Sequence, residues 1–388
     1  MPVIDLPLEG GRTEPFRTGA PREFPRAAPP FPRVALAAAH VVADPSAAHD
    51  PWDEASIDWD RTIAYRRYLW SLGLGVAEAM DTAQRGMGLD WAAARELIRR
   101  SLDAMRDFPG AAMASGAGTD HLAPGPDVTV DDVVRAYEEQ CEAVERMGGR
   151  IILMASRALA KAARGPADYE RVYARILEGV REPVIIHWLG EMFDPALAGY
   201  WGNDDHTRAM ETALAVVGAH ADKVDGVKIS LLDKGKEIAM RRRLPTGVRM
   251  YTGDDFAYAE LIAGDEHGHS DALLGIFDPI APAVGGALAR LSHDDLRGFH
   301  EILAPTVPLS RHIFRGPTRF YKTGVVFMAW LNGHQDHFTM LGGQQSARSV
   351  LHFAELFRLA DRAGLLADPE LAASRMRTLL ALHGVERG

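Results

Sequence analysis

The stretch Asp222-Lys223-Val224-Asp225-Gly226-Val227-Lys228-Ile229-Ser230 predicts a β-strand that carries a lysine near its end. Side chains alternate between the two faces of a strand, so Val227 and Ile229 share one face, and Gly226 and Lys228 share the other. In a barrel, the apolar pair would face the surrounding helices and Lys228 would point inward, with Gly226 leaving room for its stem. The alternative is a lysine at a strand end whose amine simply reaches water.

Similar short runs recur along the chain and alternate with long amphipathic stretches, which indicates repeated βα units around a parallel sheet. The expected strands are Val34–Ala38, Val76–Met80, Ala111–Ala114, Ile151–Met154, Val184–His187, Gly226–Ile229, Val248–Thr252 and Ala272–Ile276. The expected helices are Trp59–Leu72, Trp91–Met105, Val130–Met147, Ala167–Val180 and His206–His220, with Asp90 and either Thr129 or Asp131 as N-caps. Eight strands are the number that a closed (β/α)8 TIM barrel requires.

We therefore expect an α/β protein with three parts. Residues 1–32, broken by several prolines, should form an irregular N-terminal arm, residues 33–282 the barrel, and residues 283–388 a C-terminal helical extension. The extension includes a helix near Ala347–Ala363 and should form a cap or an oligomer surface, so a homo-oligomer is expected.

Composition excludes several classes of protein. The net charge of −10 works against binding nucleic acid, and we interpret Arg241-Arg242-Arg243 as a solvated helix end. The single cysteine, Cys141, fits a buried thiol in a reducing compartment. No run approaches the roughly 20 apolar residues of a membrane span, and no signal peptide is evident. We expect a cytoplasmic, soluble protein that binds neither membrane nor nucleic acid.

Three blocks of sequence carry a resemblance to a known family. Val224-Asp225-Gly226-Val227-Lys228-Ile229-Ser230 is followed by Tyr251-Thr252-Gly253-Asp254-Asp255 and then by Gly268-His269-Ser270. Together they resemble the dihydrodipicolinate synthase and N-acetylneuraminate lyase family, over residues 33 to about 282. The resemblance implies class I aldolase chemistry through a lysine imine on a 2-oxo acid, with no cofactor.

The chain departs from that family's pattern at three places, after strands two, four and five, which marks a divergent branch. Where the family has a threonine-rich turn for the substrate carboxylate, this chain has Asp81-Thr82-Ala83-Gln84-Arg85, and Gln84 and Arg85 are possible replacement donors. The family's tyrosine relay after strand four is replaced by Met154-Ala155-Ser156-Arg157. His187, at the end of strand five, is our candidate acid/base, expected to titrate near neutral pH without a large shift.

The predicted function is a lyase, an aldolase or a dehydratase, that acts on a small 2-oxo acid or sugar-derived oxo compound. Lys228 and His187 are the predicted catalytic residues. The predicted substrate-binding residues are Glu78, Thr82, Gln84, Ser156, Asp254, Asp255 and Ser270.

Two alternatives remain open. Glu78, Asp81, Asp120, His121, His187 and Glu191 all fall near expected strand ends. If three or four of them met at one point, they could hold a divalent metal for an isomerase or a metal-dependent aldolase. The second alternative is a barrel that binds a small ligand without catalysis. His334-Gln335-Asp336-His337 is expected to be a surface loop or flap, and the glycines lack the spacing of a dinucleotide fingerprint.

Overall fold

The computed structural model describes residues 1–48 and 50–385, which form parts of two compact units. Unit 1 comprises Met1–Pro32, His40–Gly73 and Ile276–Gly388. Unit 2 comprises Arg33–Ala39 and Leu74–Gly275. Each unit therefore combines stretches that lie far apart in the sequence.

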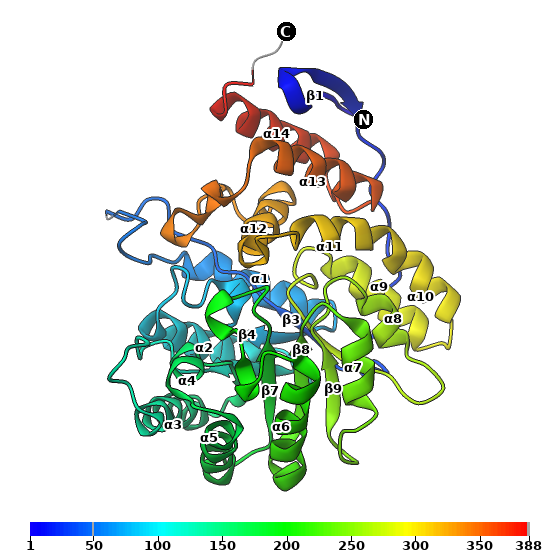
Figure 1. Ribbon diagram of the computed structural model, residues 1–388. Coiled ribbons are helices and arrows are strands. Elements are labelled where there is room, and N and C mark those ends of the chain that lie inside the picture. Colours follow the sequence, from blue (N-terminus) through cyan, green and yellow to red (C-terminus); the bar gives the residue numbers. More distant parts are fainter. Residues whose placement is uncertain (49, 386–388) are drawn as a thin grey trace. The chain divides into compact units, whose positions relative to one another are not determined.

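Unit 2 contains a closed barrel of parallel strands, in the order β10-β3-β4-β5-β6-β7-β8-β9 (Figure 1). The strands are β3 Ala35–Ala38, β4 Gly75–Glu78, β5 Met113–Ala117, β6 Arg150–Leu153, β7 Val184–Leu189, β8 Val224–Ser230, β9 Arg249–Thr252 and β10 Asp271–Leu274. Each overlaps one of the strands expected from sequence, so the TIM barrel is confirmed.

Helices surround these strands within unit 2 (Figure 1). They are α2 Trp91–Met105, α3 Val130–Arg146, α4 Arg157–Ala162, α5 Pro166–Gly179, α6 His206–Ala219, α7 Lys234–Arg241 and α8 Tyr258–Ala263. The Asp90 side chain caps α2 by accepting from the Ala93 amide at 2.8 Å. Of the two residues considered for α3, Thr129 is the N-cap: its hydroxyl accepts from the Asp132 amide, and its backbone amide donates to the Asp132 carboxylate.

The inward face of the barrel carries small and large apolar residues in alternation. Its interior cluster includes Leu36, Ala38, Ala77, Ala114, Ile152, Ile185, Tyr251 and Leu273. These residues occupy alternate positions on their strands, as the pleat of a β-strand requires. Cys141 lies outside this cluster as a buried free thiol on α3, and burial raises its pKa, so it stays protonated.

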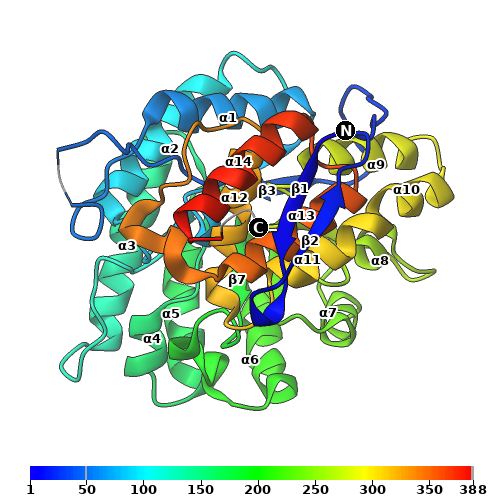
Figure 2. The same ribbon diagram turned by 90° about the horizontal axis from the view of Figure 1, so that it is seen from above.

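Unit 1 is mostly helical and includes an N-terminal hairpin that lies beside α13 and α14 (Figure 2). Its strands are β1 Val3–Pro7 and β2 Thr13–Arg17. Its helices are α1 Trp59–Ser71, α9 Ala281–Leu291, α10 Leu296–Leu303, α11 Val307–Ile313, α12 Tyr321–Leu331, α13 Val350–Arg362 and α14 Pro369–Leu382. The residues expected to form a C-terminal helical extension are helical, and they share this unit with N-terminal stretches of the chain. No helix in the described part of the chain is long and apolar enough to cross a membrane.

The prediction of an irregular N-terminal arm is wrong for its first residues. Ile4 and Leu6 are buried, at 3% and 0% exposure, whereas Val3 is 42% exposed, so β1 shows the alternation of a half-buried strand. Gly10 and Gly11, at φ 78° and 75°, make the turn into β2. β2 pairs only with β1 in the described chain, and such an edge strand tolerates Pro15.

Candidate functional site

Lys228 lies near the carboxyl end of β8, between two inward-facing neighbours. The register pairs it with His187 on β7 and with Tyr251 on β9. Directly paired residues of parallel strands point to the same face of the sheet, and Tyr251 belongs to the barrel interior. Lys228 therefore points into the barrel, where it is only 7% exposed.

The Lys228 amine is buried without a direct ionic partner. Burial lowers its pKa below the ordinary 10.5, and the negative charges of Asp255 and Asp81 act in the opposite direction. Among the described residues, no hydrogen bond or ion pair engages the amine. Desolvation without a close counter-ion favours the neutral amine, which is the nucleophilic form.

His187 is a fully buried imidazole beside the lysine. Its Nε2 lies 3.2 Å from the Ser230 hydroxyl, and its Nδ1 has no hydrogen-bond partner in the described chain. Burial, and then the charge of Lys228, lowers its pKa well below 6.5. The expectation of a group titrating near neutral pH is therefore wrong: His187 is neutral at pH 7, because both causes disfavour its cation.

Gly226 also makes room for a neighbour that the sequence did not indicate. A Cβ atom at this position would lie 2.6 Å from Cε2 of Tyr251 and 2.7 Å from the Arg249 carbonyl oxygen. The glycine thus makes room for the Tyr251 ring inside the barrel. The Tyr251 hydroxyl donates to Asp225 at 2.6 Å, which fixes the orientation of the ring.

A pocket of about 80 Å³ opens at the carboxyl ends of β4 to β7. Its wall includes His187 and Asp81, both of which act electrostatically with Lys228. Arg157, the first residue of α4, also lines the pocket and forms an ion pair with Asp194. Through these shared residues the pocket adjoins the lysine.

Arg85 is not a free carboxylate donor, contrary to the expectation for this turn. Its Nε and Nη2 donate to the Asp120 carboxylate, at 2.9 and 2.6 Å, and Nη2 also donates to the Gln140 side-chain oxygen at 2.7 Å. Nη1 donates to the carbonyl oxygens of Ala79 and Gly116, at 3.1 and 3.0 Å. All five guanidinium donors are thereby satisfied, so Arg85 holds the loops after β4 and β5 together.

The other predicted residues of this loop region also make structural contacts. Gln84 adopts a left-handed conformation, at φ 66°, and its side-chain amide donates to the Met87 carbonyl oxygen at 3.1 Å. Thr82 is buried in the 3-10 turn Asp81–Ala83. Glu78 accepts from the Ser101 hydroxyl of α2 at 2.6 Å, which directs its carboxylate toward the helix layer.

Ser156 lies at the pocket's edge as the N-cap of α4. Its hydroxyl accepts from the Leu159 amide at 2.9 Å and lies 2.6 Å from the hydroxyl of Thr119, a pocket residue. Its backbone amide donates to the Tyr200 hydroxyl at 3.0 Å. Ser156 therefore positions the first turn of α4, and with it Arg157.

Of the predicted residues after β9, Asp255 interacts with Lys228. Asp254 accepts from the backbone amides of Phe256 and Ala257, at 2.8 and 3.0 Å, within the turn. Ser270 donates to the buried Glu237 of α7 at 2.7 Å, and Thr252 donates to the same carboxyl group at 2.9 Å. Burial raises the pKa of Glu237 to about 8.

The donors considered for a metal do not converge. Among the described residues, no group of three or more His, Cys, Asp and Glu side chains could hold a metal ion. His121 lies 3.3 Å from Glu139, and Glu191 lies 3.1 Å from His206. The residue set therefore does not fit the metal-dependent alternative, which required three or four of these groups at one point.

Sequence reasoning missed two features, the buried Glu237 of α7 and the Arg157–Asp194 pair at the pocket. Glu237 lies on a short, charge-rich helix and looks like a surface residue in the sequence. Its burial depends on Ser270 and Thr252, which no local spacing connects to it. Arg157 could have been found from its position, because it directly follows the N-cap Ser156 after a barrel strand.

Comparison with known families adds to this geometry. The family described as "Protein of unknown function (DUF993)" matches residues 4–385, nearly the whole chain. The chain belongs to this family. No curated protein matches the chain.

Solved structures show that this DUF993 member has the fold of dihydrodipicolinate synthases. A putative dihydrodipicolinate synthetase from Pseudomonas aeruginosa has a TM-score of 0.62 at 16% identity, over 85% of this chain and 99% of that chain. A prophage protein of the dihydrodipicolinic acid synthase family from E. coli K12, in complex with pyruvate, gives 0.62 at 12% identity over 91% and 99%. The synthase from Acinetobacter baumannii, also complexed with pyruvate, gives 0.62 at 14% over 86% and 99%. The fold expected from the three sequence blocks is thereby confirmed.

Proposed function

We propose that this protein is a lyase that forms a Schiff base between Lys228 and the carbonyl carbon of a small oxo acid. The observation that carries the proposal is a buried lysine with a lowered pKa and no direct partner, beside a neutral imidazole, at the carboxyl end of a barrel strand. Barrel active sites are built at that end of the strands. Lysine imines are the usual use of such an amine.

The chemistry follows from the protonation states. The neutral Lys228 amine attacks the carbonyl carbon, and the carbinolamine that forms loses water to give a protonated imine. In carbon–carbon cleavage a base takes the proton of the substrate hydroxyl, the bond breaks, the fragment that carries this oxygen leaves as an aldehyde or ketone, and the bond's electron pair converts the imine to an enamine. Alternatively, the imine accepts the electron pair of a carbon–hydrogen bond whose proton leaves to a base, and becomes the same kind of enamine. In the second case, loss of a β-hydroxyl group as water completes a dehydration.

His187 is the group that we assign to proton transfer in these steps. Its orphaned Nδ1 lies within the barrel, and as a neutral imidazole it offers one donor and one acceptor nitrogen. No other imidazole is paired in register with the lysine.

Arg157 is the group that we assign to the substrate carboxylate. It lines the pocket that adjoins Lys228. Within residues 1–48 and 50–385 only its Nε is held, by Asp194, which leaves its two terminal nitrogens for a substrate. Arg85, the expected donor, has none left. Pyruvate, which two of the structurally similar proteins hold, is the first compound to test.

Borohydride trapping tests the proposal. The protein is incubated with pyruvate, glyoxylate and several sugar-derived oxo acids, reduced with borohydride, digested, and analysed by mass spectrometry. We expect one compound to leave its reduced adduct on Lys228 alone. Trapping on exposed lysines only, or no adduct above the level of Lys228→Met, would refute the imine and favour a barrel that binds its ligand without catalysis.

A further inference from the structure

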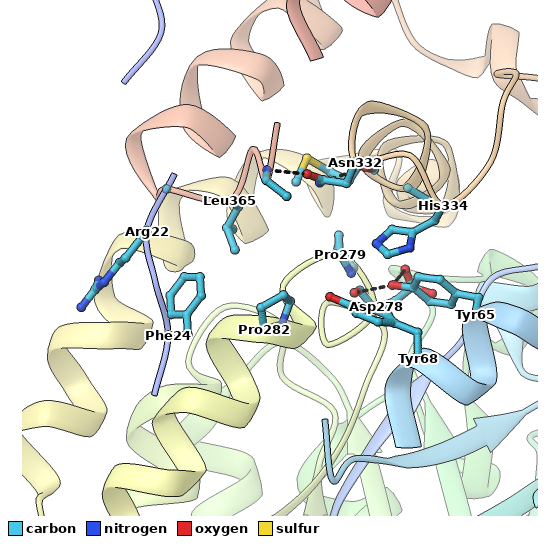
Figure 3. Close-up of a pocket in the computed structure, with 14 residues that line it drawn as sticks. Arg22, Phe24, Tyr65, Tyr68, Asp278, Pro279, Pro282, Asn332, His334 and Leu365 are labelled. Carbon is cyan, nitrogen blue, oxygen red and sulfur yellow. Dashed lines mark hydrogen bonds between the residues drawn. The ribbon is translucent and has the colours of Figure 1, made fainter. Parts of the chain in front are cut away.

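A second cavity, of about 100 Å³, lies within unit 1. Three separate stretches of the chain line it: the N-terminal segment with Phe24, helix α1 with Tyr65 and Tyr68, and the C-terminal stretch with Asp278 and His334 (Figure 3). None of these residues takes part in the Lys228 site. The loop of His334, expected to be a surface loop or flap, instead packs its imidazole against two tyrosines and buries Gln335 completely.

Three rings form one wall of this cavity, which we call the aromatic cage: Tyr65, Tyr68 and His334. The His334 ring centroid lies 4.8 Å from that of Tyr65 and 4.6 Å from that of Tyr68, and the two tyrosine centroids are 5.7 Å apart. Phe24 and Leu365 lie across the cavity from the cage (Figure 3). The cavity is therefore walled mainly by ring and apolar surfaces.

A single buried carboxylate lies against the aromatic cage. Asp278 is 1% exposed and accepts from the His40 backbone amide at 2.8 Å and from the Tyr65 hydroxyl at 3.1 Å. The His40 ring nitrogen Nδ1 lies 2.7 Å from the same carboxylate. These donors fix the carboxylate in place beside the rings.

The rings themselves carry no charge near neutral pH. Burial is the largest cause that lowers the pKa of His334 to about 4, and burial raises that of Tyr68 to about 12. Burial also raises the pKa of Tyr65, and the charge of Asp278 raises it further. The cage thus lines the cavity with neutral rings, next to the Asp278 carboxylate.

Of the arginines around the cavity, Arg22 and Arg26 are screened by water, whereas Arg66, whose charge acts on Tyr65, is buried and donates to the His40 carbonyl oxygen. Arg22 is exposed; its guanidinium lies 5.6 Å from the Phe24 ring centroid and donates to the Glu301 carbonyl oxygen at 3.1 Å. Arg26, whose charge acts on Tyr68, is also exposed. Arg375, which acts on His334, lies 3.6 Å from Asp336. Charges in water are screened over about 10 Å at 0.1 M salt, whereas the buried carboxylate is screened much less.

We propose that this cavity binds an organic cation, an alkylammonium group of the quaternary type. Aromatic rings attract such a group through their faces, and a quaternary nitrogen has no N–H donors that would need further partners in an apolar pocket. The buried Asp278 supplies the compensating charge. A metal ion fits the cavity poorly, because the described residues offer no cluster of three metal-binding side chains.

The test compares a cation with its neutral isostere. Titration calorimetry with choline, tetramethylammonium and 3,3-dimethyl-1-butanol should give saturable binding of both cations. The alcohol, which has the shape of choline without its charge, should bind at least about tenfold more weakly, as a desolvated cation–π contact implies. Equal binding of the alcohol and choline, or no saturable binding of either cation, would overturn the proposal.

Variants place the binding in the aromatic cage. Tyr68→Phe keeps the ring and should keep the affinity for choline within a few-fold, whereas Tyr68→Leu should lose about tenfold. Trp52→Ala removes an exposed aromatic residue of the same unit outside the cavity and serves as the control. Lys228→Met should bind choline like the wild type, which separates this proposal from the proposed lyase. Loss of binding equal in both Tyr68 variants, with both folded by circular dichroism, would count against ring-face recognition.

Discussion

At the scale of single residues, strand register brings together the two side chains to which we assign the chemistry, the proposed nucleophile Lys228 and the proposed proton carrier His187. Lys228 and His187 are 41 positions apart and become neighbours because β7 and β8 pair in parallel. Both are buried, and each responds to burial by preferring its neutral form. The consequences for stability and for catalysis can be measured separately.

Replacement of the lysine should abolish chemistry without harming the fold. In Lys228→Met we expect no borohydride adduct and no turnover, with a Tm equal to or above that of the wild type. Because burial lowers the pKa of Lys228, the unfolded chain binds a proton that the folded protein does not, and stability falls as pH drops below the unfolded value near 10.5. The variant should lack this loss in thermal melts at pH 7 and 9. Lys223→Met, on the partly exposed turn before β8, is the control; a lower Tm for Lys228→Met alone would contradict the account.

Replacement of the histidine should slow proton transfer and spare imine formation. We expect His187→Asn to give the trapped adduct slowly and to lose roughly 10² to 10⁴-fold in kcat, the scale of general acid–base catalysis. Because the pKa of His187 is lowered well below 6.5, the acidic limb of the wild-type rate profile should not contain a group near pH 6.5 that disappears in the variant. Stopped-flow trapping and pH–rate profiles would check both points; an unchanged kcat would assign the proton carrier elsewhere.

At the scale of elements, the alternation of strand-like runs and amphipathic stretches predicts the barrel correctly, because that pattern is local. The same reasoning predicts the lysine and its strand. It fails where a role depends on contacts between distant elements. Gly226 accommodates Tyr251 of the next strand, and the guanidinium of Arg85 donates hydrogen bonds to two loops and a helix. No spacing in a single sequence encodes such pairings.

We expect Arg85 to contribute to the stability of the fold and Arg157 to contribute to substrate binding. Arg85→Lys keeps the charge but loses the planar fork, so we expect a loss of about 2–4 kcal/mol in the free energy of unfolding, typical of a broken buried pair. Arg157→Lys, partly exposed, should change stability by less than about 0.5 kcal/mol and raise KM for the trapped oxo acid. Urea unfolding and steady-state kinetics provide the measurements. A large loss of stability in Arg157→Lys, together with a raised KM but no loss of stability in Arg85→Lys, would refute these two roles.

The buried carboxyl group of α7 should make stability depend on pH. Between the ordinary value of 4.5 and about 8, folded Glu237 holds a proton that the unfolded chain has lost, so the free energy of unfolding falls as pH rises through this range. Glu237→Gln remains neutral and should be more stable than the wild type by about 1–4 kcal/mol at pH 9 and equal to it near pH 5. Glu260→Gln, whose carboxylate is exposed and paired with Lys234, is the control; parallel wild-type and Glu237→Gln curves across this range would contradict the prediction.

At the scale of the whole molecule, each unit has a property that can be measured by itself: the unfolding of unit 1 and adduct formation at Lys228 in unit 2. Leu6 of the hairpin is fully buried within unit 1, whereas Lys228 lies in unit 2. We expect Leu6→Ala to cost about 2–5 kcal/mol in the unfolding of unit 1, measured by denaturation followed through amide exchange. Val3→Ala, at an exposed position of the same strand, should cost less than about 0.5 kcal/mol. Adduct formation at Lys228 should be unchanged below the transition; its loss in Leu6→Ala would show that the units depend on each other.

The discontinuity of unit 1 has a consequence for synthesis on the ribosome. Tyr65 and Asp278 share a hydrogen bond but are 213 residues apart, so at about 5–20 residues per second the tyrosine leaves the exit tunnel roughly 10–40 s before its partner. β3 likewise waits for β10 before the barrel can close. During that interval the hairpin, α1 and their apolar side chains lack the C-terminal helices that bury them. Nascent chains of this protein should therefore depend on chaperones that shield N-terminal segments until translation ends.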